Sequence, residues 1–231
     1  MSLEGRTIFT ESEDCVDLGL RAGAMVFRSV RVSPASAKLR TEIADEVGRI
    51  RTRLSSASEI RSIPEIVKAQ DILRTVGVKS RRRISSTESL LRFALKHGAL
   101  PSINNLVDAY NLVSLRTSSS LGAHDLDRIA TPVELRLLCG GERFVPLGSA
   151  EEEAVTAGEF GYVDALDRVI CRLDIQQADF CKVTAATTNV LLIIEATTVH
   201  DSARLRRVFE ETEEIIKHHC GGEAEVVAFP Y

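Results

Sequence analysis

The chain has 231 residues, 44% of them hydrophobic and 27% charged, which is the composition of an ordinary globular protein. This length suits one large domain with a sizeable core. The formal net charge of −4 creates no overall field that attracts nucleic acid, so any RNA contact must come from a local basic patch. With no Trp and 5% aromatic residues, the chain is a poor candidate for a base-stacking binder of single strands.

The cysteines and the absence of long apolar segments indicate a compartment. Five cysteines are scattered along the chain without a C-x-x-C pair, at Cys15, Cys139, Cys171, Cys181 and Cys220. An odd, dispersed set is typical of reduced thiols. The start, MSLEGRTIF, has no apolar signal core, and no stretch reaches the roughly 18 apolar residues of a membrane span. We therefore expect a soluble, cytoplasmic protein with no membrane partner.

The first part of the chain predicts a strand followed by helices. Residues 18–32 end in alternating apolar and polar side chains, which is typical of a strand. Ser33-Pro34 predicts a helix start, because Pro is tolerated in a first turn. A second helix is predicted from Pro64 to Gly77, where glycine suits a left-handed cap.

A run of cations precedes the next predicted helix. Ser85 and Glu88 have capping-box spacing, so this helix should begin there and end at Gly98. The cations are Lys79, Arg81, Arg82 and Arg83. At a helix entrance, phosphate could meet both guanidinium groups and free amides, which makes the run a candidate RNA contact. The alternative is an ordinary solvated surface.

Residues 102–116 predict a central helix with a polar stripe. Ser102 is placed as its N-cap. Apolar residues follow at helical spacing, namely Ile103, Leu106, Val107, Tyr110 and Val113. Asn104, Asp108 and Asn111 fall on a neighbouring stripe, where they could line a pocket and orient a polar ligand. The alternative is the solvated edge of an amphipathic helix.

The second half of the chain is richer in strands. Strands are predicted at 133–137, at 143–146 after a hairpin turn at Gly140-Gly141, at 158–163, at 168–172, at 190–194 in a central position and at 225–229. A long helix is predicted at 202–219. The expected fold is mixed α/β (α+β), with a helix-rich first half and a strand-rich second half whose sheet layers pack with helices. We expect one domain over 1–231, with a lead-in at 1–14 and a C-terminal helix and strand at 200–231.

Several kinds of chemistry lack a sequence signal. No glycine-rich nucleotide loop and no G-x-S-x-G nucleophile elbow is present. His218 and His219 are adjacent, and neighbouring side chains on a helix diverge by about 100°, so we expect no metal site there. Asp125 and Asp127 are more typical of caps and turns than of a cation site. We expect no cofactor.

Five segments carry a resemblance to a known family. They are, in order, VDAYNLVSLR, GAHDLD, ELRLLCGGERFVPLGS, GEFGYVDA and KVTAATTNVLLIIEA. This ordered series resembles the editing module of the bacterial phenylalanyl-tRNA synthetase β subunit, which is formed by its third and fourth domains. The resemblance covers roughly Cys15 to Thr198 and implies that module's mixed α/β fold.

The resemblance also implies an activity and site residues. The module hydrolyses the ester of a mischarged amino acid, typically tyrosine, on the tRNA for phenylalanine. The family's Asn corresponds to Asn111, and its Glu to Glu195, although strict spacing falls on Ile193. The family's pocket His falls on Gly122, with His124 two residues later, and this departure puts the substrate preference in question.

The sequence therefore predicts a freestanding module that deacylates mischarged tRNA without metal or ATP. Asn111 and Glu195 are the predicted catalytic residues, and Asn104, Asp108, Gly122 and His124 the predicted substrate-binding residues. Aminoacylated tRNA is the expected partner, and an amino acid the expected small ligand. Two alternatives stay open, a non-catalytic amino-acid or metabolite-binding protein and a tRNA-binding accessory.

Overall fold

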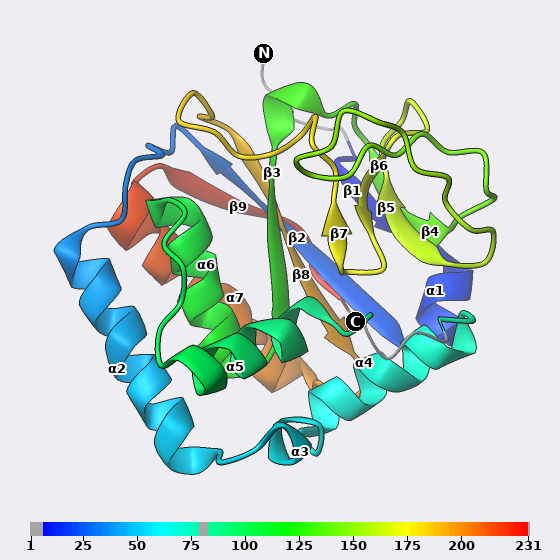
Figure 1. Cartoon of the computed structure of the whole chain (residues 1–231). Helices are drawn as coiled ribbons and strands as arrows, with labels where there is room; N and C mark the ends of the chain where they lie inside the picture. Colours follow the sequence, from blue (N-terminus) through cyan, green and yellow to red (C-terminus); the bar gives the residue numbers. More distant parts are fainter. Residues whose placement is uncertain (1–6, 79–82, 231) are drawn as a thin grey trace.

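The computed structural model of the chain describes residues 7–78 and 83–230, and in these residues two β-sheets and a layer of helices are stacked (Figure 1). The four-stranded sheet has the order β3 (Ser120–Asp125), β8 (Val190–Thr197), β2 (Leu20–Arg28), β9 (Glu223–Ala228), and its pairs are antiparallel. Strand β8 is buried along its whole length, which confirms the predicted central strand. The mixed α/β fold class is likewise confirmed.

The five-stranded sheet has the order β1 (Phe9–Glu11), β4 (Val133–Leu137), β5 (Phe160–Val163), β6 (Val169–Arg172), β7 (Gln176–Gln177). Strands β1 and β4 are parallel, and the other pairs are antiparallel. The predicted hairpin through 143–146 is wrong, because β4 pairs with β5 in the register Glu134↔Val163. Residues 138–159 form a long loop, and the buried Phe144 packs this loop against the core.

The described residues contain seven α-helices: α1 (Glu13–Asp17), α2 (Ala37–Arg53), α3 (Ala57–Ile60), α4 (Pro64–Thr75), α5 (Ser86–His97), α6 (Asn105–Thr117) and α7 (Ser202–Cys220). Helix α2 begins later than Ser33-Pro34 predicted, because Ser36 caps it by accepting from the Leu39 amide at 3.1 Å. The predicted limits of α5 are confirmed. Ser85 accepts from the Glu88 amide at 3.3 Å, and Gly98 ends the helix with a φ of 69°.

Helix α6 carries predicted site residues, and its start differs from the prediction. Asn104, not Ser102, is the N-cap, and its Oδ1 accepts from the Val107 amide at 2.9 Å. The Ser102 hydroxyl instead donates to the Asp108 carboxylate at 2.6 Å. The helix start is fixed to the rest of the fold by Asn105, whose Nδ2 donates to the Arg31 and His219 carbonyls at 2.8 and 2.9 Å.

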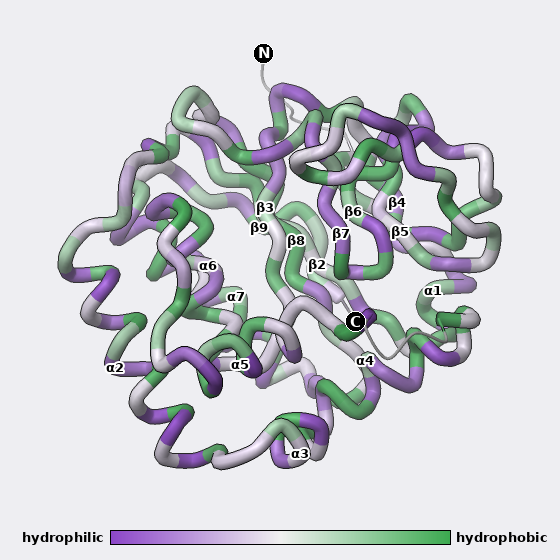
Figure 2. The backbone as a smooth tube through the Cα atoms, in the orientation of Figure 1, coloured by the Kyte–Doolittle hydropathy of each residue, from purple (hydrophilic) through white to green (hydrophobic). Residues whose placement is uncertain are grey.

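The four-stranded sheet separates two cores, because side chains alternate between its faces. Met25 and Phe27 pack among the helices α2, α5, α6 and α7, whereas Ala24 and Val26 face the five-stranded sheet. Figure 2 shows hydrophobic residues concentrated along the central strands, whereas hydrophobic and hydrophilic residues alternate along the helices. Among the described helices, none has the length and apolar character needed to cross a bilayer.

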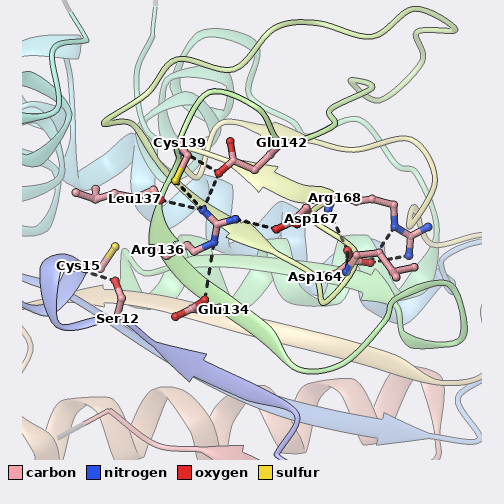
Figure 3. Close-up of polar contacts among 11 residues, drawn as sticks. Ser12, Cys15, Glu134, Arg136, Leu137, Cys139, Glu142, Asp164, Asp167 and Arg168 are labelled. Carbon is pink, nitrogen blue, oxygen red and sulfur yellow. Dashed lines mark hydrogen bonds and ion pairs between the residues drawn. The ribbon is translucent and has the colours of Figure 1, made fainter.

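Two arginines hold the loops beside β4 (Figure 3). Arg136 contacts Glu142 at 2.6 Å and Asp167 at 3.2 Å. Arg168 pairs with Asp164 at 2.6 Å. The acidic side chains in this region therefore have guanidinium partners, which fix the turns between the strands of the five-stranded sheet.

Candidate functional site

A pocket of about 450 Å³ lies where α5, the middle of α6, β3 and the turn between β6 and β7 meet. Its lining residues are Ile84, Ser86, Thr87, Ser89, Leu90, Phe93, Pro101, Ile103, Tyr110, Asn111, Ser114, Leu121, Gly122, His124, Cys171, Asp174, Ile175 and Gln177. Phe93 and Ile103 are 40% and 65% exposed and give the pocket an apolar rim. The volume falls within the range of small-molecule sites.

Three residues that the sequence predicted as site residues line this pocket. Asn111 comes from α6, and Gly122 and His124 come from β3. Asn111 is half-buried, and its side-chain amide forms no hydrogen bond with another described residue. Its donor and acceptor groups are therefore free for a ligand in this part of the structure.

The imidazole of His124 reaches back over Gly122. Residues two apart on a strand share a face, so Gly122 and His124 lie on the face of β3 opposite to Leu121 and Ala123, which pack in the core with the helices. The Nε2 atom of His124 lies 3.7 Å from the position that a Cβ at Gly122 would take. Its Nδ1 atom lies 3.4 Å from the Gln177 side-chain nitrogen and 3.7 Å from the Cys181 sulfur. Burial lowers the pKa of His124 to about 4, so the ring is neutral at physiological pH.

The opposite wall holds a carboxylate that sequence reasoning missed. Asp174 lies in the turn between β6 and β7 with a φ of 53°, a left-handed conformation that Asp tolerates better than most residues. Its Oδ2 accepts from the Ser86 hydroxyl at 3.2 Å. The same Ser86 hydroxyl lies 3.1 Å from that of Ser120, which in turn lies 2.7 Å from that of Thr87. A hydroxyl network therefore joins α5, β3 and this turn.

Burial raises the pKa of Asp174 to about 7, although hydrogen bonds from Ser120 and Ser86 lower it in part. No Lys or Arg of the described chain lines the pocket. An acid that no cation neutralises and that burial keeps partly protonated is characteristic of sites that bind or react with a ligand. No spacing motif in the sequence connects Asp174 to Asn111, since 62 residues and several strands separate them.

Glu195 lies behind the pocket and does not line it. It sits on β8 beside Ser120 of β3, on the face of the sheet that also carries Ile193. Its Oε2 accepts from the Tyr162 hydroxyl at 2.5 Å. Burial and the charge of Asp174 raise the pKa of Glu195 well above its usual range, and the Tyr162 bond offsets only part of this. Glu195 is therefore a neighbour of Ser120 and Asp174, but its side chain does not line the pocket.

Asn104 and Asp108 do not line this pocket. The oxygen of Asn104 is occupied by the helix cap. Asp108 is 2% exposed and accepts from the Ser102 hydroxyl and the Ile103 amide, at 2.6 and 2.9 Å. Their predicted stripe serves the start of α6, and only Asn111, one turn further along the helix, reaches the site.

The predicted RNA-contacting run falls mostly outside the described residues, which exclude Lys79, Arg81 and Arg82. Arg83 is described, and its guanidinium pairs with the Glu159 carboxylate at 3.1 Å. Glu159 also pairs with the buried Arg172 at 2.6 Å. Part of the charge of Arg83 is thus neutralised within the fold.

The expectation that His218 and His219 diverge is corrected by the structure. Their rings lie in edge-to-face contact with centroids 4.7 Å apart. With Glu42 of α2 they place three potential ligand atoms within 4.8 Å of one another. The Nε2 atom of His218 is already 2.6 Å from the Lys38 ammonium, and His219 contacts Glu42 at 3.3 Å. These contacts explain the cluster as hydrogen-bonded side chains on the surface of α2 and α7, and we assign no metal to it.

Comparisons with known proteins place the chain in a family. The search of curated proteins gave no match. Among solved structures, an N-terminal fragment of the phenylalanyl-tRNA synthetase β subunit from Pyrococcus horikoshii is similar, with a TM-score of 0.47 and 15% sequence identity over 94% of this chain and 50% of that one. The chain thus spans about half the length of that fragment. Residues 68–217 match the B3/4 domain, a range that contains every residue lining the pocket. Because this match covers more than half of its length, the chain belongs to the B3/4 domain family.

Proposed function

We propose that this protein hydrolyses the ester bond of mischarged aminoacyl-tRNA as a freestanding module. One observation carries the proposal: Asn111, Gly122 and His124, which the family resemblance assigns to the site, line a single pocket. The family match extends over the same residues. The resemblance to the editing module of the synthetase β subunit supplies the reaction type.

The charges around the pocket favour an ester over a free amino acid. A free amino acid carries a carboxylate, and the described lining offers no cation to neutralise it. Asp174, the only carboxylic acid among the described lining residues, would repel it when ionised. An aminoacyl ester keeps the ammonium group but has an uncharged carbonyl in place of the carboxylate. This difference favours the enzyme over the alternative of a free-amino-acid-binding protein.

The reaction asks little of the side chains. Water adds to the ester carbonyl carbon, the bond from that carbon to the ribose oxygen breaks, and the ribose oxygen takes up the proton that the water loses. The products are a free amino acid and tRNA with its hydroxyl restored. The Asn111 amide can donate to the developing oxyanion, and the neutral His124 ring can orient the water, because both line the same pocket.

The direct test is incubation of the purified chain with a panel of mischarged tRNAs, with loss of the ester measured over time. We expect cleavage without ATP and in the presence of EDTA. Asn111→Ala should lower turnover by roughly a hundred-fold, the usual effect of removing one oxyanion donor, and leave tRNA binding nearly intact. Asn189→Ala is the matched control, because that amide contacts Asp127 and does not line the pocket.

Two results would contradict the proposal. Loss of cleavage in EDTA would exclude a metal-free mechanism. If no ester of a complete panel is cleaved faster than in buffer, the protein is not a deacylase, and binding of free amino acids and of uncharged tRNA then decides between the two non-catalytic alternatives.

A further inference from the structure

Asp174 lines the pocket and has no basic partner among the described residues. Three buried acids also have no basic partner, but they do not line the pocket: Asp108, Asp125 and Glu195 accept hydrogen bonds from Ser102, Thr187 and Tyr162, respectively. Six buried acids of the described chain have an arginine partner: Glu46, Glu65, Glu88, Glu142, Glu159 and Asp164. Asp174 instead has the Ser86 hydroxyl at 3.2 Å and the network that extends to Ser120. Removing a carboxylate from water is costly unless an opposite charge compensates it. At the wall of the pocket formed by Asp174, no described side chain supplies this opposite charge.

The surroundings of Asp174 contain no hidden cation in the described part of the chain. Its neighbours with ionisable groups are Glu195 on β8, Tyr162 on β5 and Cys171 on β6, none of which carries a positive charge. His124 across the pocket is neutral at physiological pH, because burial lowers its pKa to about 4. Within the described part of the chain, no side chain brings a positive charge to Asp174, and a ligand can supply it.

We propose that Asp174 binds the primary ammonium of the acyl group and makes the site specific for esters whose amino group is free. This inference rests on the proposed function and adds the chemical group by which the substrate is selected. In an aminoacyl ester the ammonium and the ester carbonyl are both attached to the α-carbon. An ammonium bound at Asp174 therefore holds the reacting carbonyl in the pocket that Asn111 also lines. N-acylated and peptidyl esters have no such cation and would leave Asp174 uncompensated. Asp174 is a specificity-determining residue, and it takes no part in bond breaking.

The test compares one mischarged tRNA that the protein cleaves with its N-acetyl derivative. For the native protein we expect kcat/KM to be at least ten-fold higher for the free amine. Asp174→Asn should remove most of this preference by slowing cleavage of the free-amine substrate and sparing the acetylated one. Asp174→Glu should restore part of it. Asp179→Asn is the matched control, since Asp179 pairs with Lys182 at 2.9 Å outside the pocket and should keep the native preference.

A binding experiment separates this proposal from the proposed function. Amino-acid amides carry the ammonium without a carboxylate and cannot be cleaved as esters. By titration calorimetry, the native protein should bind at least one amide of a panel ten-fold more tightly than its N-acetyl form, and Asp174→Asn should abolish the difference. If esters resist cleavage but this difference is found, the deacylase function fails and ammonium recognition stands.

The proposal is overturned by either of two results. In the first, native protein treats free and acetylated ligands alike. In the second, Asp174→Asn weakens both to the same extent, which would give Asp174 a purely structural role.

Discussion

Glu142 and Asp174 are two carboxylates in turns of the same five-stranded sheet, yet their environments have opposite effects. Glu142 accepts from the Arg136 guanidinium at 2.6 Å and from the Cys139 amide at 2.7 Å (Figure 3). It also accepts from the Gly140 amide at 2.9 Å. Burial raises the pKa of Glu142, but these bonds outweigh it and lower the pKa to about 2. Asp174 has only neutral partners, and burial raises its pKa to about 7.

The difference shows which acid serves the fold and which is available to a ligand. A lowered pKa means that the folded state favours the charged carboxylate, so Glu142 stabilises the protein at neutral pH. A raised pKa means that the folded state disfavours the charge, so an ionised Asp174 destabilises it. Residues kept at such a cost are typical of functional sites. The first three predictions below run from the largest expected change in free energy to the smallest. The last tests whether a lysine placed beside Asp174 makes the ionised carboxylate stabilising.

The largest effect is expected for Glu142→Gln, which should lower the free energy of unfolding by about 2 kcal/mol at pH 7, the usual contribution of hydrogen bonds to a charged group. The native advantage is full above the ordinary Glu pKa of 4.5 and should be lost as pH falls from there toward about 2. Urea denaturation across this range measures it. Glu134→Gln is the control, because that carboxylate lies 3.8 Å from the same arginine and is half exposed. Equal effects of the two substitutions would contradict the assignment.

The next effect concerns the basic run, because a pocket with an acid and no described cation offers nothing to attract phosphate. Replacing Lys79, Arg81, Arg82 and Arg83 together by Ala should weaken tRNA binding by roughly ten-fold or more at moderate salt. Arg83→Ala alone should contribute least, since Glu159 already neutralises part of its charge. Binding titrations at two salt concentrations measure both the affinity and its salt slope. Unchanged affinity in the quadruple variant would move the tRNA contact to another surface.

A smaller effect of opposite sign is expected for Asp174→Asn, which should raise the free energy of unfolding by about 1 kcal/mol at pH 8.5. A shift of one pKa unit corresponds to roughly 1.4 kcal/mol, and we reduce the total because solvent screens a partly exposed charge. The folded pKa of about 7 lies above the ordinary 3.8, so the native protein gains stability as pH falls through this interval. The advantage of the variant should shrink accordingly and be nearly absent at pH 4. Denaturation curves at the two pH values test this. A less stable variant at pH 8.5 would mean that Asp174 has a cationic partner in the fold.

The sequence predicted much of the fold where local signals act alone. The cap at Ser85, the glycine end at Gly98 and the buried central strand at 190–194 all rest on short-range chemistry. The long-range pairing of β4 with β1 and β5 was missed, because Gly140-Gly141 is typical of a local hairpin turn. In the structure β4 pairs with β1 and β5 instead of with residues 143–146. The predicted cap at Ser102 was wrong because the Ser102 hydroxyl donates to the Asp108 carboxylate and does not accept from an amide of the first turn.

The site was predictable only in part, for the same physical reason. Asn111, Gly122 and His124 lie within a short stretch, so the order of motifs in the sequence could identify them together. Asp174 reaches the pocket because the left-handed turn after β6 aims it at the start of α5. No sequence spacing encodes that meeting, which depends on the packing of one sheet against the other. Glu195 was assigned by resemblance and stands behind the pocket wall, and its role stays a prediction.

The last prediction supplies the missing cation from within the chain. Ser89 lines the pocket, is exposed and lies one turn after Ser86, the residue that contacts Asp174. Long side chains on a helix lean toward its N-terminus, so the ammonium of Ser89→Lys can approach Asp174 and occupy the place proposed for the substrate.

We expect this variant to gain about 0.5 kcal/mol of stability at pH 8.5, the size of a partly exposed ion pair, and to lose binding of amino-acid amides. Ser89→Gln is the neutral control of similar length and should change neither. The decisive measurement is a double-mutant cycle: in the Asp174→Asn background, Ser89→Lys should add no stability, because the charge it was meant to pair with is gone. A gain that persists in the Asp174→Asn background would show that the lysine stabilises the protein through another contact. The difference between the paired Glu142 and the unpaired Asp174 would then not account for the effect of the lysine.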